Sequence, residues 1–204
     1  MHDQTPCVDY SQLESVYAPL AESIRRLIDV SIRTEAEPAA VAVATSMIDS
    51  AAAKLSGTLQ PGPLGVHHMP DGQTIAWGNV VVGVRNPVAP PLVIQHDTDG
   101  LVWSEFVLGA AYEGPPGNVH GGVCALVLDH VLGATAHHPG RPAYTGTLTL
   151  RYRRPTPLGR PLRAEAHAER TEGVKTFAVG TLADEDGATV EAEGIFIHPK
   201  QGPA

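Results

Sequence analysis

Residues 114–138 read GPPGNVHGGVCALVLDHVLGATAHH, a glycine-rich loop that runs into an apolar segment. The segment at 123–136 has only two ionisable residues, Asp129 and His130, and is apolar nearly all round when drawn as a helix. A helix of that kind belongs in a protein core. We therefore expect one long helix over 123–136 that the rest of its domain buries.

The sequence on both sides of this helix alternates between apolar and polar residues, as half-buried strands do. Two strands are expected before the helix, joined across Thr98-Asp99-Gly100, and four after it in a meander; they cover 92–97, 101–109, 143–154, 160–173, 174–187 and 188–199. Asp186-Gly187 is a typical hairpin turn sequence. An antiparallel sheet with one long helix to bury is an α+β fold.

The first 87 residues show a different sequence pattern. Residues 11–33 carry apolar side chains at helical spacing, with Pro19 expected to break or kink the helix. An alanine-rich helix is expected over 37–56, and a turn-rich connector with one strand, NVVVGVR at 79–85, follows it. We divide the chain into an N-terminal helical extension with its connector, 1–87, and a second domain, 88–200.

Composition excludes several classes of protein. The chain has 204 residues and a formal charge of −8, which argues against nucleic acid as a partner. No apolar stretch approaches the length of a membrane span, so no membrane partner is expected. Cys7 and Cys124 are too few and too far apart for a disulfide framework, and the first residues lack a secretory pattern. We expect a cytoplasmic protein.

The charge is unevenly distributed. Residues 141–175 hold eight of the fourteen basic side chains and only three acidic ones, a local charge of +5. Such a segment on an acidic protein suits a compact anionic ligand better than a polyanion. The alternative is an ordinary solvated strand surface.

Asp129 and the glycine pair before the helix are the candidate chemical groups. A carboxylate on a core helix is costly unless it is paired or changes its pKa, so Asp129 is either functional or locally hydrogen-bonded. His130 lies about 100° further round the helix and is expected to be a partner or boundary residue. Gly121-Gly122 would leave backbone N–H groups pointing out of the helix start, where they can stabilise an oxyanion in acyl transfer.

These residues resemble one family. His120-Gly121-Gly122 followed by Asp129, together with Gly114-Pro115-Pro116-Gly117 and the run LRYRRPTPLG at 150–159, resembles the hotdog-fold acyl-CoA thioesterases. The match is to the phenylacetate-pathway (PaaI-like) group and its mammalian relatives in the thioesterase superfamily. It covers roughly 88–198 and leaves 1–87 outside.

The resemblance implies an antiparallel sheet wrapped around one long helix. It implies a homodimer whose two sheets join edge to edge, or a dimer of such dimers, with active sites at the subunit interface. Asp129 would be the catalytic carboxylate, and Gly122, with Gly121, the oxyanion donor. His120 would fix the loop or contact the thioester, and Thr145 would help to hold water or substrate. Asn118 would either orient the attacking water or serve the turn.

Thioester hydrolysis suits this set because a thiolate leaves readily, so one carboxylate and an oxyanion donor suffice. Asp129 could activate water or attack the carbonyl, and these alternatives stay open. Coenzyme A would be part of the substrate, so no separate cofactor is expected. The phosphates of coenzyme A would lie near some of Arg153, Arg154, Arg160 and Lys175.

Other classes of function fit less well. A hotdog enoyl-thioester hydratase or dehydratase is the enzymatic alternative, and a non-catalytic acyl-CoA-binding module is the other. The histidines show no metal-ligand spacing, so no metal site is expected, and no serine stands in a nucleophile-elbow motif.

Overall fold

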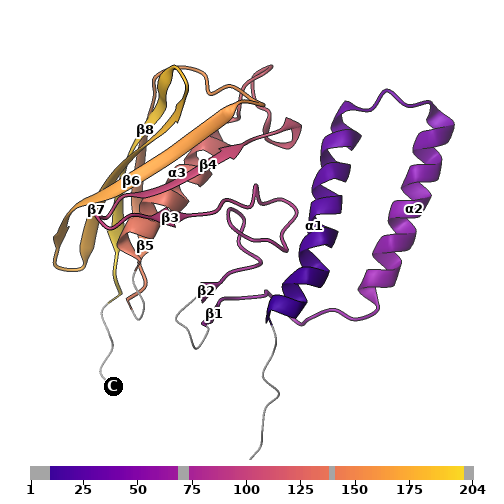
Figure 1. Ribbon diagram of the computed structural model, residues 1–204, viewed down its shortest axis with the longest axis horizontal. Coiled ribbons are helices and arrows are strands. Elements are labelled where there is room, and N and C mark those ends of the chain that lie inside the picture. The colour runs from indigo at the N-terminus through magenta and orange to yellow at the C-terminus, as the bar shows by residue number, and fades with distance from the viewer. Residues whose placement is uncertain (1–9, 69–73, 138–140, 200–204) are drawn as a thin grey trace, which may run out of the picture.

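The computed structural model describes residues 10–68, 74–137 and 141–199 (Figure 1). Within them, one six-stranded antiparallel sheet has the order β3-β4-β6-β7-β8-β5, and helix α3, Gly121–Ala136, lies against one face. The strands are β3 Gln95–His96, β4 Val102–Val107, β5 Tyr144–Tyr152, β6 Pro161–Glu172, β7 Lys175–Asp184 and β8 Gly187–Ile197. The predicted α+β hotdog arrangement with an N-terminal helical region is confirmed.

Helix α3 is buried by the inner face of this sheet. Leu128, Val131 and Leu132 have no exposed surface, and the sheet meets them mainly with small and aliphatic side chains. Close approach depends on glycine at Gly180. A Cβ there would stand 2.5 Å from the carbonyl oxygen of Glu165 on β6 and 2.7 Å from Cδ1 of Leu132 on α3, so a larger residue would disturb both the sheet and its packing on the helix.

The last four strands do not form the expected meander. β6, β7 and β8 are consecutive neighbours, but β5 pairs with β8 at the sheet edge, and β6 pairs with β4. After β5 the chain runs through Pro155 and Pro157, which cannot donate ladder hydrogen bonds, so no tight hairpin joins β5 to β6. Alternation along the sequence indicates strands but not which strands are neighbours.

The N-terminal region consists of two helices, α1 Tyr10–Arg33 and α2 Pro38–Ser56 (Figure 1). α1 continues through Pro19 without a break. Arg25 fastens α1 to the connector: its guanidinium donates to the backbone carbonyls of Ala89 and Asn86, both at 3.0 Å, and to two further carbonyls. Among the described residues, no helix is long and apolar enough to cross a membrane.

The connector is irregular, and the strand expected at 79–85 is wrong. Short strands β1, His67–His68, and β2, Thr74–Ile75, pair with each other, while 79–85 forms turns. Oδ1 of Asn79 accepts from the backbone N–H groups of Val81 (2.7 Å) and Val82 (3.0 Å). This side chain satisfies backbone donors that a strand would have used. A short 3-10 helix, η1 Ala110–Tyr112, follows β4.

Candidate functional site

Asp129 and Thr145 come together in the structure. Asp129 is half-buried on α3, and Thr145 stands near the start of edge strand β5. Oγ1 of Thr145 donates to Oδ1 of Asp129 at 2.8 Å. The β5–β8 register shifts between Thr145 and Thr147, and such bulges change where a neighbouring side chain points. One carboxylate oxygen of Asp129 is thereby fixed.

His130, the next residue on α3, is in a different environment. Burial lowers its pKa, and the nearby Asp129 charge raises it by a smaller effect. Its imidazole is therefore more readily neutral than a histidine in water. Asp129 and His130 are both half-buried, and Asp129 differs in accepting the hydrogen bond from Thr145.

The start of α3 is capped by a histidine side chain. Nδ1 of His120 accepts a hydrogen bond from the Gly122 N–H at 3.0 Å. Because Nδ1 accepts, the neutral ring carries its proton on Nε2. None of the described residues accepts from the Gly121 N–H, whereas the Gly121 carbonyl accepts from the Tyr152 hydroxyl at 2.9 Å. Of the two predicted oxyanion donors, Gly121 has the available N–H.

The loop before α3 holds Asn118 in a turn. Its side-chain amide donates to the carbonyl of Pro116 at 2.9 Å, and its own carbonyl accepts from the Gly114 N–H at 2.9 Å. Asn118 also forms an isolated bridge with Pro157. These contacts match the turn role; the water-orienting role stays a prediction.

Buried polar residues that sequence reasoning gave no role support the same helix start. Oγ1 of Thr156 donates to Oγ1 of Thr189 at 2.9 Å, and Sγ of Cys124 lies 3.6 Å from Oγ1 of Thr156. The Thr156 carbonyl accepts from the Val119 N–H. Burial raises the pKa of the Cys124 thiol, which makes it a poor nucleophile. Thr156, like Tyr152, lies in the strand-and-turn run at 150–159, but the sequence alone does not show that it contacts α3.

The two halves of the predicted site do not meet within one chain. Gly122 and Asp129 are seven residues apart on α3, about 10 Å along the axis at about 1.5 Å per residue. The strand contacts repeat this separation, since Tyr152 reaches Gly121 while Thr145 reaches Asp129 from the opposite end of β5.

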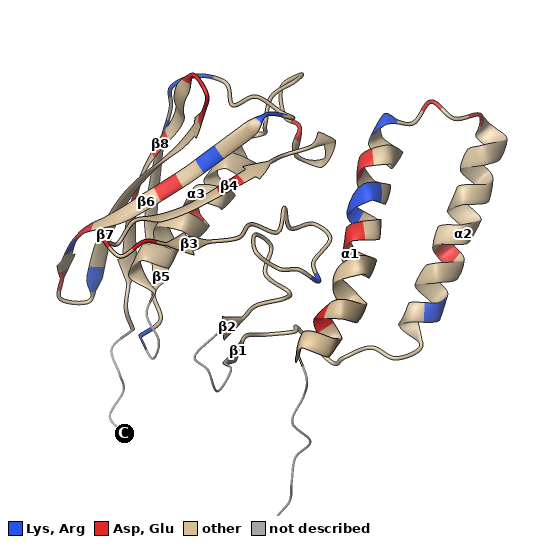
Figure 2. Ribbon diagram, in the orientation of Figure 1, with Lys and Arg blue, Asp and Glu red and all other residues tan. Residues whose placement is uncertain are grey.

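The basic segment is largely neutralised by acidic side chains from other strands. Figure 2 shows basic and acidic residues close together over the sheet. The predicted coenzyme-binding arginines all have carboxylate partners: Arg153 with Glu191, Arg154 with Asp184 and Arg160 with Glu185. The Arg154 guanidinium lowers the pKa of Asp184 to about 2.

Lys175 lies away from these arginines. It begins β7, whereas Asp184 and Glu185, the partners of Arg154 and Arg160, lie at the other end of that strand. Ten residues of strand separate the ends by about 30 Å at about 3.3 Å per residue. The register places Lys175 beside Ile197, which pairs with Tyr144, so Lys175 is at the Thr145 end of the sheet. The four residues form no single cluster.

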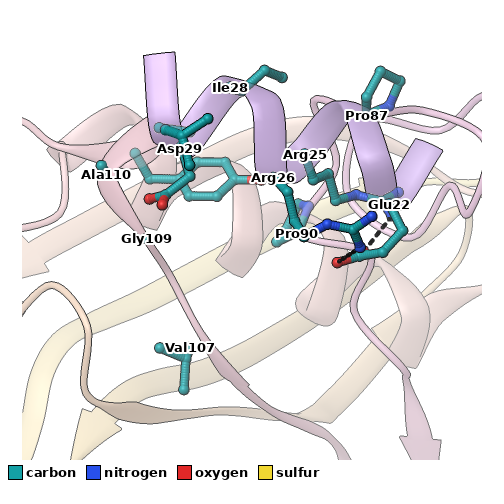
Figure 3. Close-up of a pocket in the computed structure, with 13 residues that line it drawn as sticks. Glu22, Arg25, Arg26, Ile28, Asp29, Pro87, Pro90, Val107, Gly109 and Ala110 are labelled. Atoms are coloured by element: carbon teal, nitrogen blue, oxygen red, sulfur yellow. Dashed lines mark hydrogen bonds and ion pairs between the residues drawn. The ribbon is translucent and has the colours of Figure 1, made fainter. Parts of the chain in front are cut away.

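A pocket of about 430 Å³ lies where α1 meets the connector and η1 (Figure 3). Its lining includes Arg25, Asp29, Pro90 and Tyr112, and none of the predicted site residues. The Arg25–Glu22 ion pair, at 3.3 Å, lies in its wall. This hollow belongs to the joint between the extension and the sheet domain.

Known proteins match both parts of the chain. A family model described as Thioesterase superfamily matches residues 116–191. A crystal structure of a thioesterase superfamily protein is 34% identical, with a TM-score of 0.79, over 89% of this chain and 94% of its own. The chain belongs to the thioesterase superfamily. Because the match covers 89% of the chain, it includes most of the extension, which the motif resemblance left out.

Curated relatives match a little less than half of the chain. The acyl-coenzyme A thioesterase THEM4 of Xenopus laevis is 35% identical over 94 residues, 45% of this chain and 42% of that protein. The THEM4 of Mus musculus is 34% identical over 96 residues, 46% of this chain and 41% of its own. The match thus spans less than half the length of these relatives.

A more distant structure shares the fold alone. A hypothetical thioesterase protein from Streptococcus pneumoniae, solved with coenzyme A, is 17% identical with a TM-score of 0.50. It covers 55% of this chain and 91% of its own. The similarity therefore extends over little more than half of this chain, compared with 89% for the structure above.

Proposed function

We propose that this protein hydrolyses acyl-CoA thioesters to a free acid and coenzyme A. The observation that carries the proposal is the hydrogen bond from Thr145 to Asp129, on a superfamily domain whose curated relatives are named acyl-CoA thioesterases. Asp129 is the only carboxylate on α3, and Thr145 fixes one of its oxygens. The other oxygen is left for a water or for the thioester carbon.

In this mechanism the carboxylate of Asp129 either takes a proton from the attacking water or attacks the carbonyl carbon itself. The negative charge that develops on the carbonyl oxygen is stabilised by the Gly121 N–H at the positive end of the α3 dipole. His120 engages Gly122 through Nδ1, which leaves Nε2–H as a second donor at the same end of the helix. The thiolate of coenzyme A then leaves without a strong acid, so the reaction needs no further cofactor. If Asp129 is the nucleophile, thiolate departure leaves a mixed anhydride of Asp129 and the acyl group, and a water then hydrolyses it to the free acid and the regenerated carboxylate.

The working unit in this proposal is a homodimer. A thioester carbonyl cannot contact Asp129 and Gly121 of the same helix, since these lie about two turns apart. A second copy that pairs along the exposed edge of β5 would bring its own helix start toward Asp129. Each dimer would hold two sites, and a dimer of dimers would hold four.

Coenzyme A recognition is assigned first to Lys175. Arg153, Arg154 and Arg160 are already paired with carboxylates, whereas Lys175 has no ion-pair partner among the described residues. Lys175 also lies at the end of the sheet that carries Thr145. We also propose a cytoplasmic location, and the buried free thiol of Cys124 supports it.

The test is release of free thiol from a panel of acyl-CoAs, followed with a thiol reagent. Purified protein is expected to release thiol from at least one acyl chain. Loss of enoyl absorbance from an enoyl-CoA without thiol release would indicate a hydratase instead. Binding of acyl-CoA without either reaction would indicate a non-catalytic module, and both results would overturn the proposal.

A further inference from the structure

Helix α2 is rich in apolar residues, and none of the described residues covers it. It has 19 residues, of which only Asp49 and Lys54 are charged, and every one of them is exposed. Figure 2 shows it as an almost uncharged helix standing outside α1. The apolar side of a helix is normally buried. This one is exposed at Val43 (62%) and Met47 (69%), which lie on the same side of the helix.

The exposed apolar residues follow a helix-packing pattern. Val41, Ile48 and Leu55 recur every seven residues along α2, the spacing of a helix–helix seam. On α1, Val16, Leu20 and Val30 form an exposed stripe on the side opposite Arg25, the side chain that fastens α1 to the connector. The hairpin of α1 and α2 therefore presents apolar stripes on both helices.

The charge of the hairpin suits contact between identical chains. The protein carries −8, so two copies repel each other over much of their surface. α1 has three basic and three acidic residues, and α2 has one of each, so both helices are neutral. A neutral apolar surface on an acidic protein is where two copies can meet without that repulsion.

A membrane fits less well as the cover of α2. A membrane surface would favour a helix with a basic polar face, but the polar side of α2 carries one lysine and one aspartate and so has no net charge.

We propose that the α1–α2 hairpin is a self-association surface. The Val41–Ile48–Leu55 stripe of α2 packs against the α1–α2 hairpin of a second copy, so that two hairpins make a four-helix bundle. This contact is separate from the edge of β5 and from Asp129. It therefore stands or falls independently of the proposed hydrolase activity.

The test is hydrogen exchange of the backbone amides of 38–56 in the full-length protein, with light scattering to measure the mass of the particle. In the wild type, slow exchange of α2 is expected at high protein concentration and is lost on serial dilution, while α3 stays protected. Protection of α2 that does not depend on concentration would overturn the proposal. So would protection that appears only with vesicles of anionic phospholipid.

Ile48→Ala separates association from simple helix stability. Alanine is the better helix former, so a merely solvated α2 would exchange more slowly in this variant. If Ile48 packs against a second copy, the substitution instead speeds exchange and shifts the loss of protection to higher protein concentration. Val93→Ala is the matched control, because Val93 is 68% exposed outside the hairpin, and it should leave α2 exchange unchanged.

Discussion

α3 and α2 are two apolar helices with opposite surroundings. α3 has 16 residues, of which six are buried under the sheet of its own chain. α2 has 19 residues, all of them described, and none is buried. A similar composition therefore gives a core in one place and an open surface in the other. Hydrophobicity indicates that a helix will be covered, but only the connectivity of the chain decides by what.

The largest expected effect contrasts the cores of the two helices. Leu128→Ala on α3 removes a side chain with no exposed surface and should lower the free energy of unfolding by about 2–5 kcal/mol. Ile48→Ala on α2, in dilute protein, should change the unfolding of the sheet domain by less than about 0.5 kcal/mol. Chemical denaturation of both variants measures the difference. Equal losses would mean that α2 is part of the same core.

The next prediction compares the two aspartates. Asp129→Asn should lower kcat for acyl-CoA hydrolysis at least about 100-fold, because it removes the proposed base or nucleophile. Asp49→Asn, the same change on α2, should leave kcat unchanged. Thiol release measures both, and circular dichroism checks that the variants are folded. Full activity in Asp129→Asn would remove this carboxylate from the mechanism.

A smaller effect is expected at Thr145. Thr145→Ala removes the hydroxyl that donates to Asp129 and should lower kcat about tenfold, the value of one hydrogen bond to a charged group. Thr145→Ser keeps the hydroxyl and should restore most of the rate. If Ser and Ala behave alike, the methyl packing of Thr145 matters and the hydrogen bond does not.

The smallest effect concerns pH and His130 on α3. Burial lowers the pKa of His130 in the folded protein below its usual value of about 6.5. As the pH falls, the imidazole is protonated in the unfolded chain at a higher pH than in the folded protein. The contribution of His130 to the free energy of unfolding is therefore greatest above about pH 6.5 and decreases as the pH drops below that value. His130→Gln should reduce this acid loss, while His137→Gln, at an exposed position, should not. Denaturation at pH 7.5 and pH 5.5 measures it.

Much of the sheet domain could be predicted from the sequence because its local patterns agree with its tertiary contacts. The apolar run at 123–136 and the alternating strands suffice for an α+β fold. The position of β5 beside β8 could not be predicted, since pairing between distant strands leaves no local pattern. The strand expected at 79–85 failed because Asn79 satisfies the backbone of its own turn.

Some residues of the candidate site could likewise be predicted from the sequence, and others could not. Asp129 and the glycine pair could be selected from the residues themselves, whereas Thr145 depended on the family resemblance, and the structure brings Thr145 to Asp129. The partners of Arg153, Arg154 and Arg160 lie 25 to 38 residues further along the chain. A count of charges over 141–175 therefore predicts a basic segment. In the folded protein, acidic residues from other parts of the chain form ion pairs with these arginines.

Arg25 has a consequence for how this protein can change over evolutionary time. Its guanidinium is recognised by carbonyl oxygens of the main chain at 83–89 and not by any side chain there. Every amino acid supplies the same carbonyl, so the hydrogen bonds of Arg25 survive substitutions in the connector that keep its backbone path. Contacts between side chains, such as the Arg85 guanidinium 3.6 Å from the centre of the Tyr17 ring, are the part of the joint that substitution can change.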